Sequence, residues 1–237
     1  MSHAENTSVA TAYRGRVARD YDEARFETPQ GRLFSELELQ QLNHAARRLE
    51  RGARVLEVGC GTARFSASLA RQGFDVVATD PSADMIEVAA GKCAGTETLR
   101  FERMEGGDLS FPNEAFDFVF AIRVTNQTES EEYALRMIRE MIRVAKRGAL
   151  ILVEFVNRQR PLGKRARSVR LSFGQIGRVV QDSDCSVVSR HGVLVFSQSV
   201  LDRVPDVLVP WWGRVERLAA RGFWPWASRG YVLLRKR

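Results

Sequence analysis

Between residue 54 and about residue 156, short apolar runs rich in β-branched residues alternate with segments long enough for helices. This alternation is typical of βαβ units, in which helices cover a sheet of parallel strands. We predict strands at residues 54–58, 75–79, 99–103, 116–122 and 149–155, and helices at residues 63–72, 83–91 and 131–145. An amphipathic helix is predicted at residues 33–49, and two further short strands at residues 186–189 and 231–234. The pattern therefore predicts an α/β fold built on a parallel sheet.

The length of 237 residues suits one large domain, or one domain with an added lobe, because single hydrophobic cores stop growing only somewhat above this size. With 44% hydrophobic and 27% charged residues, the composition is that of an ordinary globular protein. The first twenty residues lack the apolar stretch of a secretory signal, and no run approaches the roughly 18 apolar residues of a spanning helix. The three cysteines are far apart, which favours neither a disulfide framework nor a zinc site. We expect a cytoplasmic protein without a bound metal.

The net charge of +7 is unevenly distributed along the chain. Residues 1–157 carry 20 Lys and Arg against 24 Asp and Glu, whereas residues 158–237 carry 16 against 5. This asymmetry indicates an anionic partner for the C-terminal region, such as an acidic substrate, a membrane surface or nucleic acid. The alternative is an arginine-rich surface that only contacts solvent. Six basic residues fall in a segment that we predict as a loop or lid: Arg158, Arg160, Lys164, Arg165, Arg167 and Arg170.

A Gly-x-Gly turn joins the first predicted strand to the first helix of the alternating region. Gly59 and Gly61 allow the backbone to approach a ligand where a side chain would clash, and the N–H groups of the following helix face that ligand. About twenty residues later the second strand ends in Asp80, whose carboxylate can accept hydrogen bonds from both hydroxyls of a ribose. Together these residues predict a nucleotide-type pocket.

Two residues argue against a nicotinamide or flavin dinucleotide in this pocket. The third glycine of the dinucleotide fingerprint would fall at Arg64, whose bulk hinders the close approach of helix and strand. Glu57 places a carboxylate just before the turn, which suits a cationic cofactor and disfavours a pyrophosphate.

The chain here resembles the class I S-adenosylmethionine-dependent methyltransferases, whose signature is Glu-x-Gly-x-Gly-x-Gly after a hydrophobic strand. Glu57, Gly59 and Gly61 match, and Ala63 replaces the last glycine. The resemblance covers roughly residues 50–156 and continues through the Asp80, Met85 and Gly107-Asp108-Leu109 positions, Phe111-Pro112, and the strand at residues 116–120. It implies a Rossmann-like α/β fold with a seven-stranded, mostly parallel sheet, helices on both faces and a C-terminal lid or insertion.

The same resemblance implies S-adenosyl-L-methionine as the cofactor and assigns its contacts by region. Gly59, Cys60 and Gly61 would line the methionine part, and Asp80 would hold the ribose. Met85 would cover the adenine, Asp108 with Leu109 would meet the adenine edge, and Arg123 with Val124 would lie beside the sulfonium and the acceptor. Residues 17–22 resemble an Ala-x-x-Tyr-Asp segment in which Tyr21 folds over the cofactor; an ordinary helix end on the surface is the alternative. Glu57 and Pro81 complete the expected cofactor-binding set.

The acceptor side of the site is less defined by the sequence, and the catalytic residue stays unassigned because no general base stands out. Open α/β sheets bind ligands in the crevice beyond the carboxyl ends of their strands. We therefore expect acceptor contacts from Asn126, Glu154 and Asn157, with His191 and Trp211 as further candidates. For His191, a partly buried histidine near a turn is the alternative.

All four tryptophans, Trp211, Trp212, Trp224 and Trp226, fall within sixteen residues. They favour an acceptor lid, an interfacial helix on lipid head groups, or a second small core under the last strand, and we expect this core for at least two of them.

These observations predict three regions: a helical cap at residues 1–50, a cofactor-binding core at residues 51–157, and a basic, tryptophan-rich acceptor region at residues 158–237 that completes the sheet. We expect methyl transfer to an O, N or C atom of a small organic or lipid-like acceptor. The basic region would suit an anionic acceptor. The concentrated aromatics and the lack of a recognised RNA-binding module argue against nucleic acid. An RNA-modifying methyltransferase and a non-catalytic cofactor-binding protein remain alternatives. Peripheral membrane contact, and the choice between monomer and homodimer, stay open.

Overall fold

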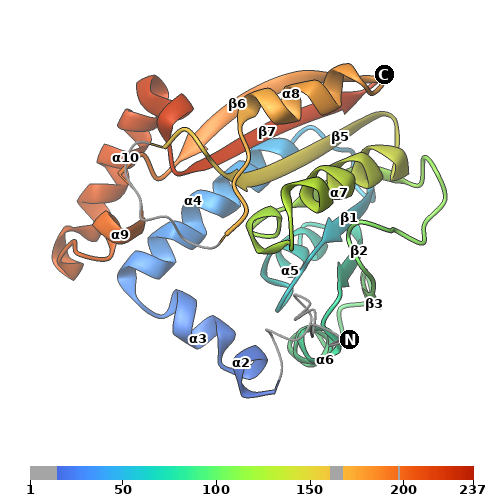
Figure 1. Cartoon of the computed structure of the whole chain (residues 1–237). Helices are drawn as coiled ribbons and strands as arrows, with labels where there is room; N and C mark the ends of the chain where they lie inside the picture. Colours follow the sequence, from blue (N-terminus) through green and yellow to red (C-terminus); the bar gives the residue numbers. More distant parts are fainter. Residues whose placement is uncertain (1–14, 161–167, 197) are drawn as a thin grey trace, which may run out of the picture.

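The computed structural model describes residues 15–160, 168–196 and 198–237, and its core is a seven-stranded sheet in the order β3-β2-β1-β4-β5-β7-β6 (Figure 1). Neighbouring strands from β3 to β5 are parallel, whereas β7 is antiparallel to both β5 and β6. The fold class predicted from the sequence is confirmed. The strands are β1 Arg54–Val58, β2 Asp75–Asp80, β3 Leu99–Arg103, β4 Phe116–Ala121, β5 Ala145–Val156, β6 Cys185–Val193 and β7 Arg229–Lys236.

Helices cover both faces of the sheet, because successive residues of each inner strand are buried on opposite sides. On β1, Val55 contributes to the apolar cluster under α4, α5 and α10, whereas Leu56 contributes to the cluster under α7 and α8. Figure 1 shows these layers. The helices are α2 Arg16–Arg19, α3 Tyr21–Phe26, α4 Pro29–Ala46, α5 Arg64–Ala70, α6 Ala83–Lys92, α7 Glu131–Val144, α8 Phe173–Gln181, α9 Gln198–Leu201 and α10 Val209–Phe223, with 3₁₀ turns η1 Thr125–Gln127, η2 Asp206–Leu208 and η3 Trp224–Trp226.

Side-chain caps set the start of several helices. Ser82 accepts a hydrogen bond from the Met85 N–H at the start of α6. Ser172 begins α8 with a reciprocal capping box to Gln175, a signal that the sequence prediction missed together with the helix itself.

No helix in the described ranges combines the length and the apolar character that membrane crossing requires.

The structure corrects two predictions about strand ends. β5 begins at Ala145, directly after α7, and Gly148 (φ +80°) lies within an irregular part of this strand rather than at a helix end. His191 does not follow its strand: it lies inside β6, paired with Tyr231 of β7. In both places pairing with a neighbouring strand extends the sheet beyond the apolar run that the sequence displays.

The tryptophans divide between the core and the surface. Trp212 contacts the ring of Phe196 at a centroid distance of 5.3 Å, and Trp224 contacts Phe173 at 5.1 Å. Trp211 and Trp226 are exposed, at 59% and 51%. Trp212 packs against the large apolar cluster that includes Tyr231 and Leu233 of β7, and not in a second small core.

Candidate functional site

A cavity of about 680 Å³ opens where the carboxyl ends of β1, β2 and β4 meet α3. Most of the residues expected at the cofactor line it: Tyr21, Glu57, Gly59, Cys60, Gly61, Asp80, Pro81, Met85, Arg123 and Val124. Six more described residues line the same cavity and were not predicted: Phe26, Thr62, Arg64, Phe65, Ile122 and Gln127. Phe26 gave no signal in the sequence, because its place depends on how α3 packs across the turn after β1, and Arg64 was considered only as an obstacle to a dinucleotide.

The turn after β1 follows the geometry that its glycines allow. Gly59 has a φ of +76°, and a Cβ atom there would lie 2.5 Å from Val124 Cγ2. Gly61 has a φ of +54°, but an added Cβ would meet no described atom within 4 Å. The N–H groups of Gly59 and Cys60 both donate to the Thr79 carbonyl, at 2.7 and 2.8 Å, which fixes the turn to β2. Gly59 is thus needed by the packing, whereas Gly61 leaves space open at the cavity.

Ala63, where the resembling family has a third glycine, also adopts a left-handed conformation, with φ +65°. A side chain in this region is strained by roughly 1–2 kcal/mol. Ala63 thus adopts, at this cost, a conformation that glycine adopts freely.

Asp80 ends β2 with its carboxylate at the cavity. Its Oδ2 accepts from the Gly61 N–H and its Oδ1 from the Ser82 N–H, both at 2.9 Å. Burial raises the pKa of Asp80, and these two hydrogen bonds oppose that rise. The carboxylate is held in one orientation beside the turn, with lone pairs remaining for a ligand.

Glu57 is buried beneath the turn. Its Oε2 accepts from both the backbone N–H (2.9 Å) and the hydroxyl of Ser66, while its Oε1 has no hydrogen-bond partner among the described residues. Burial raises the pKa of Glu57 to about 8, against the opposing hydrogen bonds from Ser66. The side chain is therefore mostly protonated at pH 7, and a cationic group nearby would favour its ionised form.

Comparison with known proteins agrees with this geometry. Residues 55–148 match a family described as a methyltransferase domain. Demethylmenaquinone methyltransferase of Clavibacter sepedonicus is 34% identical over 116 residues, which are 48% of this chain and 46% of that protein. Ubiquinone biosynthesis O-methyltransferase of Rhizobium johnstonii is also 34% identical over 116 residues, 48% of this chain and 45% of that protein. The crystal structure of magnesium protoporphyrin IX methyltransferase from Synechocystis with bound S-adenosylhomocysteine aligns with a TM-score of 0.59 at 17% identity, over 88% of this chain and 83% of that chain.

The chain carries a class I S-adenosylmethionine-dependent methyltransferase domain. The family and the cofactor implied by the sequence resemblance are thereby confirmed. The matched stretch spans about half the length of the two curated relatives, at 46% and 45%, and the likeness to the solved structure concerns the fold.

The cavity of the methyltransferase domain suits a nucleoside that carries a cationic group. Glu57 Oε1 is a buried oxygen without a partner among the described residues, and the space beside Gly61 is open. Helix α3 covers this space: the Thr62 hydroxyl donates to Asp22 Oδ1, and the Lys92 ammonium contacts Asp22 Oδ2, both at 2.6 Å. Asp22 thus links α3 to the turn after β1 and to α6.

A second cavity of about 930 Å³ adjoins the first and shares four lining residues with it, Gly59, Pro81, Val124 and Gln127. Asp108 lines this second cavity. Leu109 is buried in the apolar core, and its N–H donates to Glu140 Oε2 at 3.0 Å. The structure therefore separates the two residues that the resemblance places together at the adenine edge.

The residues expected at the acceptor are dispersed, and none of them is among the described residues that line the first cavity. Glu154 and Asn157 are fully buried. Glu154 pairs with Arg229 at 3.0 Å, and Asn126 Oδ1 accepts from the same guanidinium at 3.4 Å. The Asn157 amide donates to two backbone carbonyls of the segment before β7. These three side chains hold β5, η1 and β7 together.

His191 and Trp211 have other surroundings. His191 lines a third cavity of about 710 Å³ formed with residues of α4 and α10, and its ring lies 5.9 Å from that of His44. Burial and the neighbouring His44 lower the pKa of His191. Trp211 is exposed on α10. Lys164, Arg165 and Arg167 of the predicted loop lie outside the described residues.

Proposed function

We propose that the protein transfers a methyl group from S-adenosylmethionine to an O, N or C atom of a small organic or lipid-like acceptor. The observation that carries this proposal is the convergence of Glu57, the Gly59–Gly61 turn and Asp80 on one cavity inside the matched methyltransferase segment. When bound, the cofactor supplies an electrophilic methyl group on a sulfonium. The protein's task is to align an acceptor with that methyl group, and positioning alone can supply about 7–11 kcal/mol.

The residue assignments follow from the cavity. Asp80 would accept hydrogen bonds from the ribose hydroxyls, because each of its two oxygens accepts one backbone N–H and has a further lone pair. Met85 would cover the adenine and Asp108, in the adjoining cavity, would meet its edge. Tyr21 on α3 would cover the bound cofactor.

No histidine is among the described residues that line the cavity. Its two carboxyl groups, Glu57 and Asp80, both have a pKa that burial raises, and both lie at the turn assigned to the cofactor. We propose that the reaction depends on alignment rather than on a dedicated base, which favours an acceptor that is already anionic or has an activated carbon. Because two curated relatives are named for demethylmenaquinone and for ubiquinone biosynthesis, quinone-like rings are the first acceptors to test.

Calorimetry with S-adenosylhomocysteine tests the cofactor site. Asp80→Ala should weaken binding at least about tenfold, because hydrogen bonds to a charged group contribute about 1.5–3 kcal/mol each. Glu87→Ala, which removes an exposed carboxylate on α6, is the matched control and should leave the affinity unchanged. Equal affinity of the Asp80→Ala variant and the wild type would contradict the site. Transfer of a labelled methyl group to a panel of acceptors then tests the reaction itself.

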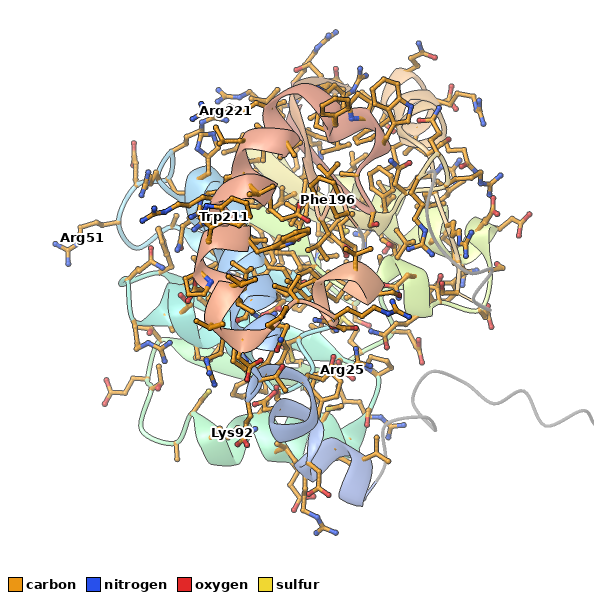
Figure 2. All side chains as sticks on the ribbon, turned by 90° about the vertical axis from the view of Figure 1, so that its left-hand side faces the viewer. Arg25, Arg51, Lys92, Phe196, Trp211 and Arg221 are labelled. Atoms are coloured by element: carbon orange, nitrogen blue, oxygen red, sulfur yellow. The ribbon has the colours of Figure 1, made fainter. Side chains whose placement is uncertain are left out.

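We further propose that residues 158–237 select the acceptor and that α10 contacts an anionic lipid surface. Val207, Trp211 and Leu218 are exposed on or just before α10, at 83%, 59% and 63%. The exposed Arg214, Arg217 and Arg221 lie on the same helix, and Figure 2 shows Trp211 and Arg221 along the face turned toward the viewer. Large apolar side chains interleaved with arginine suit the head-group region of a membrane.

Sedimentation with lipid vesicles tests this contact. Vesicles containing phosphatidylglycerol should retain the protein, and pure phosphatidylcholine vesicles should retain less, because each basic side chain near an anionic surface contributes about 1 kcal/mol. Trp211→Ala should weaken retention on the anionic vesicles without changing cofactor affinity. Absence of retention on the vesicles containing phosphatidylglycerol would refute the proposal.

A further inference from the structure

Arg123 is a buried arginine at the inner edge of the cofactor cavity. It directly follows Ile122 at the end of β4, has a φ of +66°, and is 7% exposed. Its guanidinium carbon lies 5.6 Å from the ring centre of Phe26 and 5.0 Å from that of Phe34. The side chain thus lies near two aromatic rings, of which Phe26 lines the cavity together with Arg123.

The Arg123 guanidinium makes no hydrogen bond to any described residue. Its Nε is buried without a partner, and its ion-pair contact is to Glu38 Oε1 at 3.8 Å, beyond hydrogen-bond distance. An arginine carries five N–H donors, and buried donors in folded proteins are nearly always satisfied. A buried guanidinium with unpaired N–H groups at the wall of a cavity indicates a binding site for a ligand atom that accepts hydrogen bonds.

The neighbouring carboxylates do not neutralise the positive charge of Arg123. Glu38 is bound by Arg64 at 2.5 Å, and Glu154 is bound by Arg229 at 3.0 Å. The second oxygen of Glu154 accepts the backbone N–H of Arg123 at 2.7 Å, which positions the residue without neutralising its side chain. Burial raises the pKa of Glu38, and the nearby Arg123 and Arg64 oppose that rise. In this cluster three guanidinium groups face two carboxylates.

We propose that Arg123 binds an anionic oxygen, a carboxylate or phenolate, of an aromatic acceptor. The inference rests on the proposed function and specifies its substrate class. Two oxygens of a carboxylate match the fork of a guanidinium, and the Phe26 ring, which lines the cavity, suits a flat apolar body.

The cofactor's own carboxylate has the same chemistry, but it is attached to an ammonium group. The Arg64 and Arg123 guanidiniums approach the Phe26 ring at 4.4 and 5.6 Å, so an ammonium beside them would be repelled. An anionic acceptor without a neighbouring cation avoids this repulsion.

Binding of benzoate to the protein saturated with S-adenosylhomocysteine tests the proposal, with neutral benzamide as the matched ligand. Benzoate should bind saturably to the wild type, and Arg123→Met should weaken it at least about tenfold, which corresponds to about 1.4 kcal/mol. Benzamide should bind both proteins equally. Methionine is chosen because an unbranched side chain is the milder replacement at a positive φ.

Two further variants test whether the charge at Arg123 controls benzoate binding. Glu38→Gln removes the negative charge 3.8 Å from the guanidinium and should strengthen benzoate binding. Arg51→Met removes an exposed arginine outside the cavity, visible at the edge of the molecule in Figure 2, and should change nothing. Thermal melting and the affinity for S-adenosylhomocysteine report whether each variant is folded.

The outcomes separate this inference from the proposed function. If S-adenosylhomocysteine binds but benzoate does not, or if benzoate binds the wild type and Arg123→Met equally, Arg123 is not an anion site and the proposal is overturned. If Arg123→Met instead loses affinity for S-adenosylhomocysteine but not for its analogue lacking the carboxylate, Arg123 holds the cofactor, and the acceptor assignment is wrong while the cofactor site stands. If S-adenosylhomocysteine does not bind the wild type, the proposed function itself fails.

Discussion

Replacing Glu57 by glutamine should change how the stability of the protein depends on pH. Glu57 is 1% exposed, and its Oε2 accepts two hydrogen bonds from Ser66. Glutamine keeps an oxygen for these bonds and has nearly the same shape, but it cannot ionise. The substitution therefore isolates the free energy of burying the charge.

The magnitude follows from the shift of the pKa of Glu57 from 4.5 to about 8. Because the folded protein holds this proton more tightly than the unfolded chain, the contribution of Glu57 to stability is fully present below pH 4.5 and is lost as the pH rises through 8. The loss amounts to about 1.4 kcal/mol per pH unit, about 3 kcal/mol by pH 7 and about 5 kcal/mol above pH 8. Glu57→Gln removes this loss.

Urea unfolding of the cofactor-free wild type and variant at pH 5, 7 and 9 measures the effect. The stability of Glu57→Gln relative to the wild type should rise with pH, by about 4 kcal/mol between pH 5 and pH 9. Titrating groups that do not interact with Glu57 cancel in this difference. A difference that is constant with pH would show that glutamine only changes the packing, and one that falls with pH would refute the reasoning outright.

Three further variants test other parts of the site. Gly59→Ala should destabilise the fold by at least about 2 kcal/mol through clash and backbone strain. Gly61→Ala should cost about 1–2 kcal/mol of stability and mainly weaken S-adenosylhomocysteine binding. Equal melting temperatures of the two variants would contradict the turn geometry. Tyr231→Phe removes a buried hydroxyl without a hydrogen-bond partner among the described residues and should leave stability unchanged or raise it by up to about 1 kcal/mol in urea unfolding; a clear loss would reveal a partner. Asp22→Ala breaks the contact with Thr62 and should speed cofactor release several-fold in stopped-flow displacement, with a stability change below about 1 kcal/mol; an unchanged release rate would mean that α3 does not retain the cofactor.

Burial and polar contacts explain why the predicted acceptor residues do not gather at the cavity. Glu154 and Asn157 stand at the carboxyl end of β5, where the sequence predicts ligand contacts. Both side chains instead bind groups of the distant β7 region, Arg229 for one and two backbone carbonyls for the other. A residue at a strand end can face a crevice or the core, and the choice depends on which strand lies next to it.

The sequence by itself determined the local elements and the cofactor turn. The observed bounds of β1 and β3 equal the predicted ones, and Ser82 caps α6 through the nearby Met85 N–H. Short windows suffice here, because apolar periodicity, capping residues and glycines with positive φ act through neighbouring backbone groups. The capping box that begins α8 was equally local, so that helix could have been predicted.

Only the tertiary structure decided the order of the strands, the antiparallel insertion of β7 and the state of Arg123. Its residue type and its place after β4 were visible in the sequence, but its lack of hydrogen bonds within the described residues was not. That state depends on Phe26, Glu38 and Glu154, which come from α3, α4 and β5. Because these partners are far apart in the chain, no local pattern encodes whether a buried charge is satisfied by the protein or left for a ligand.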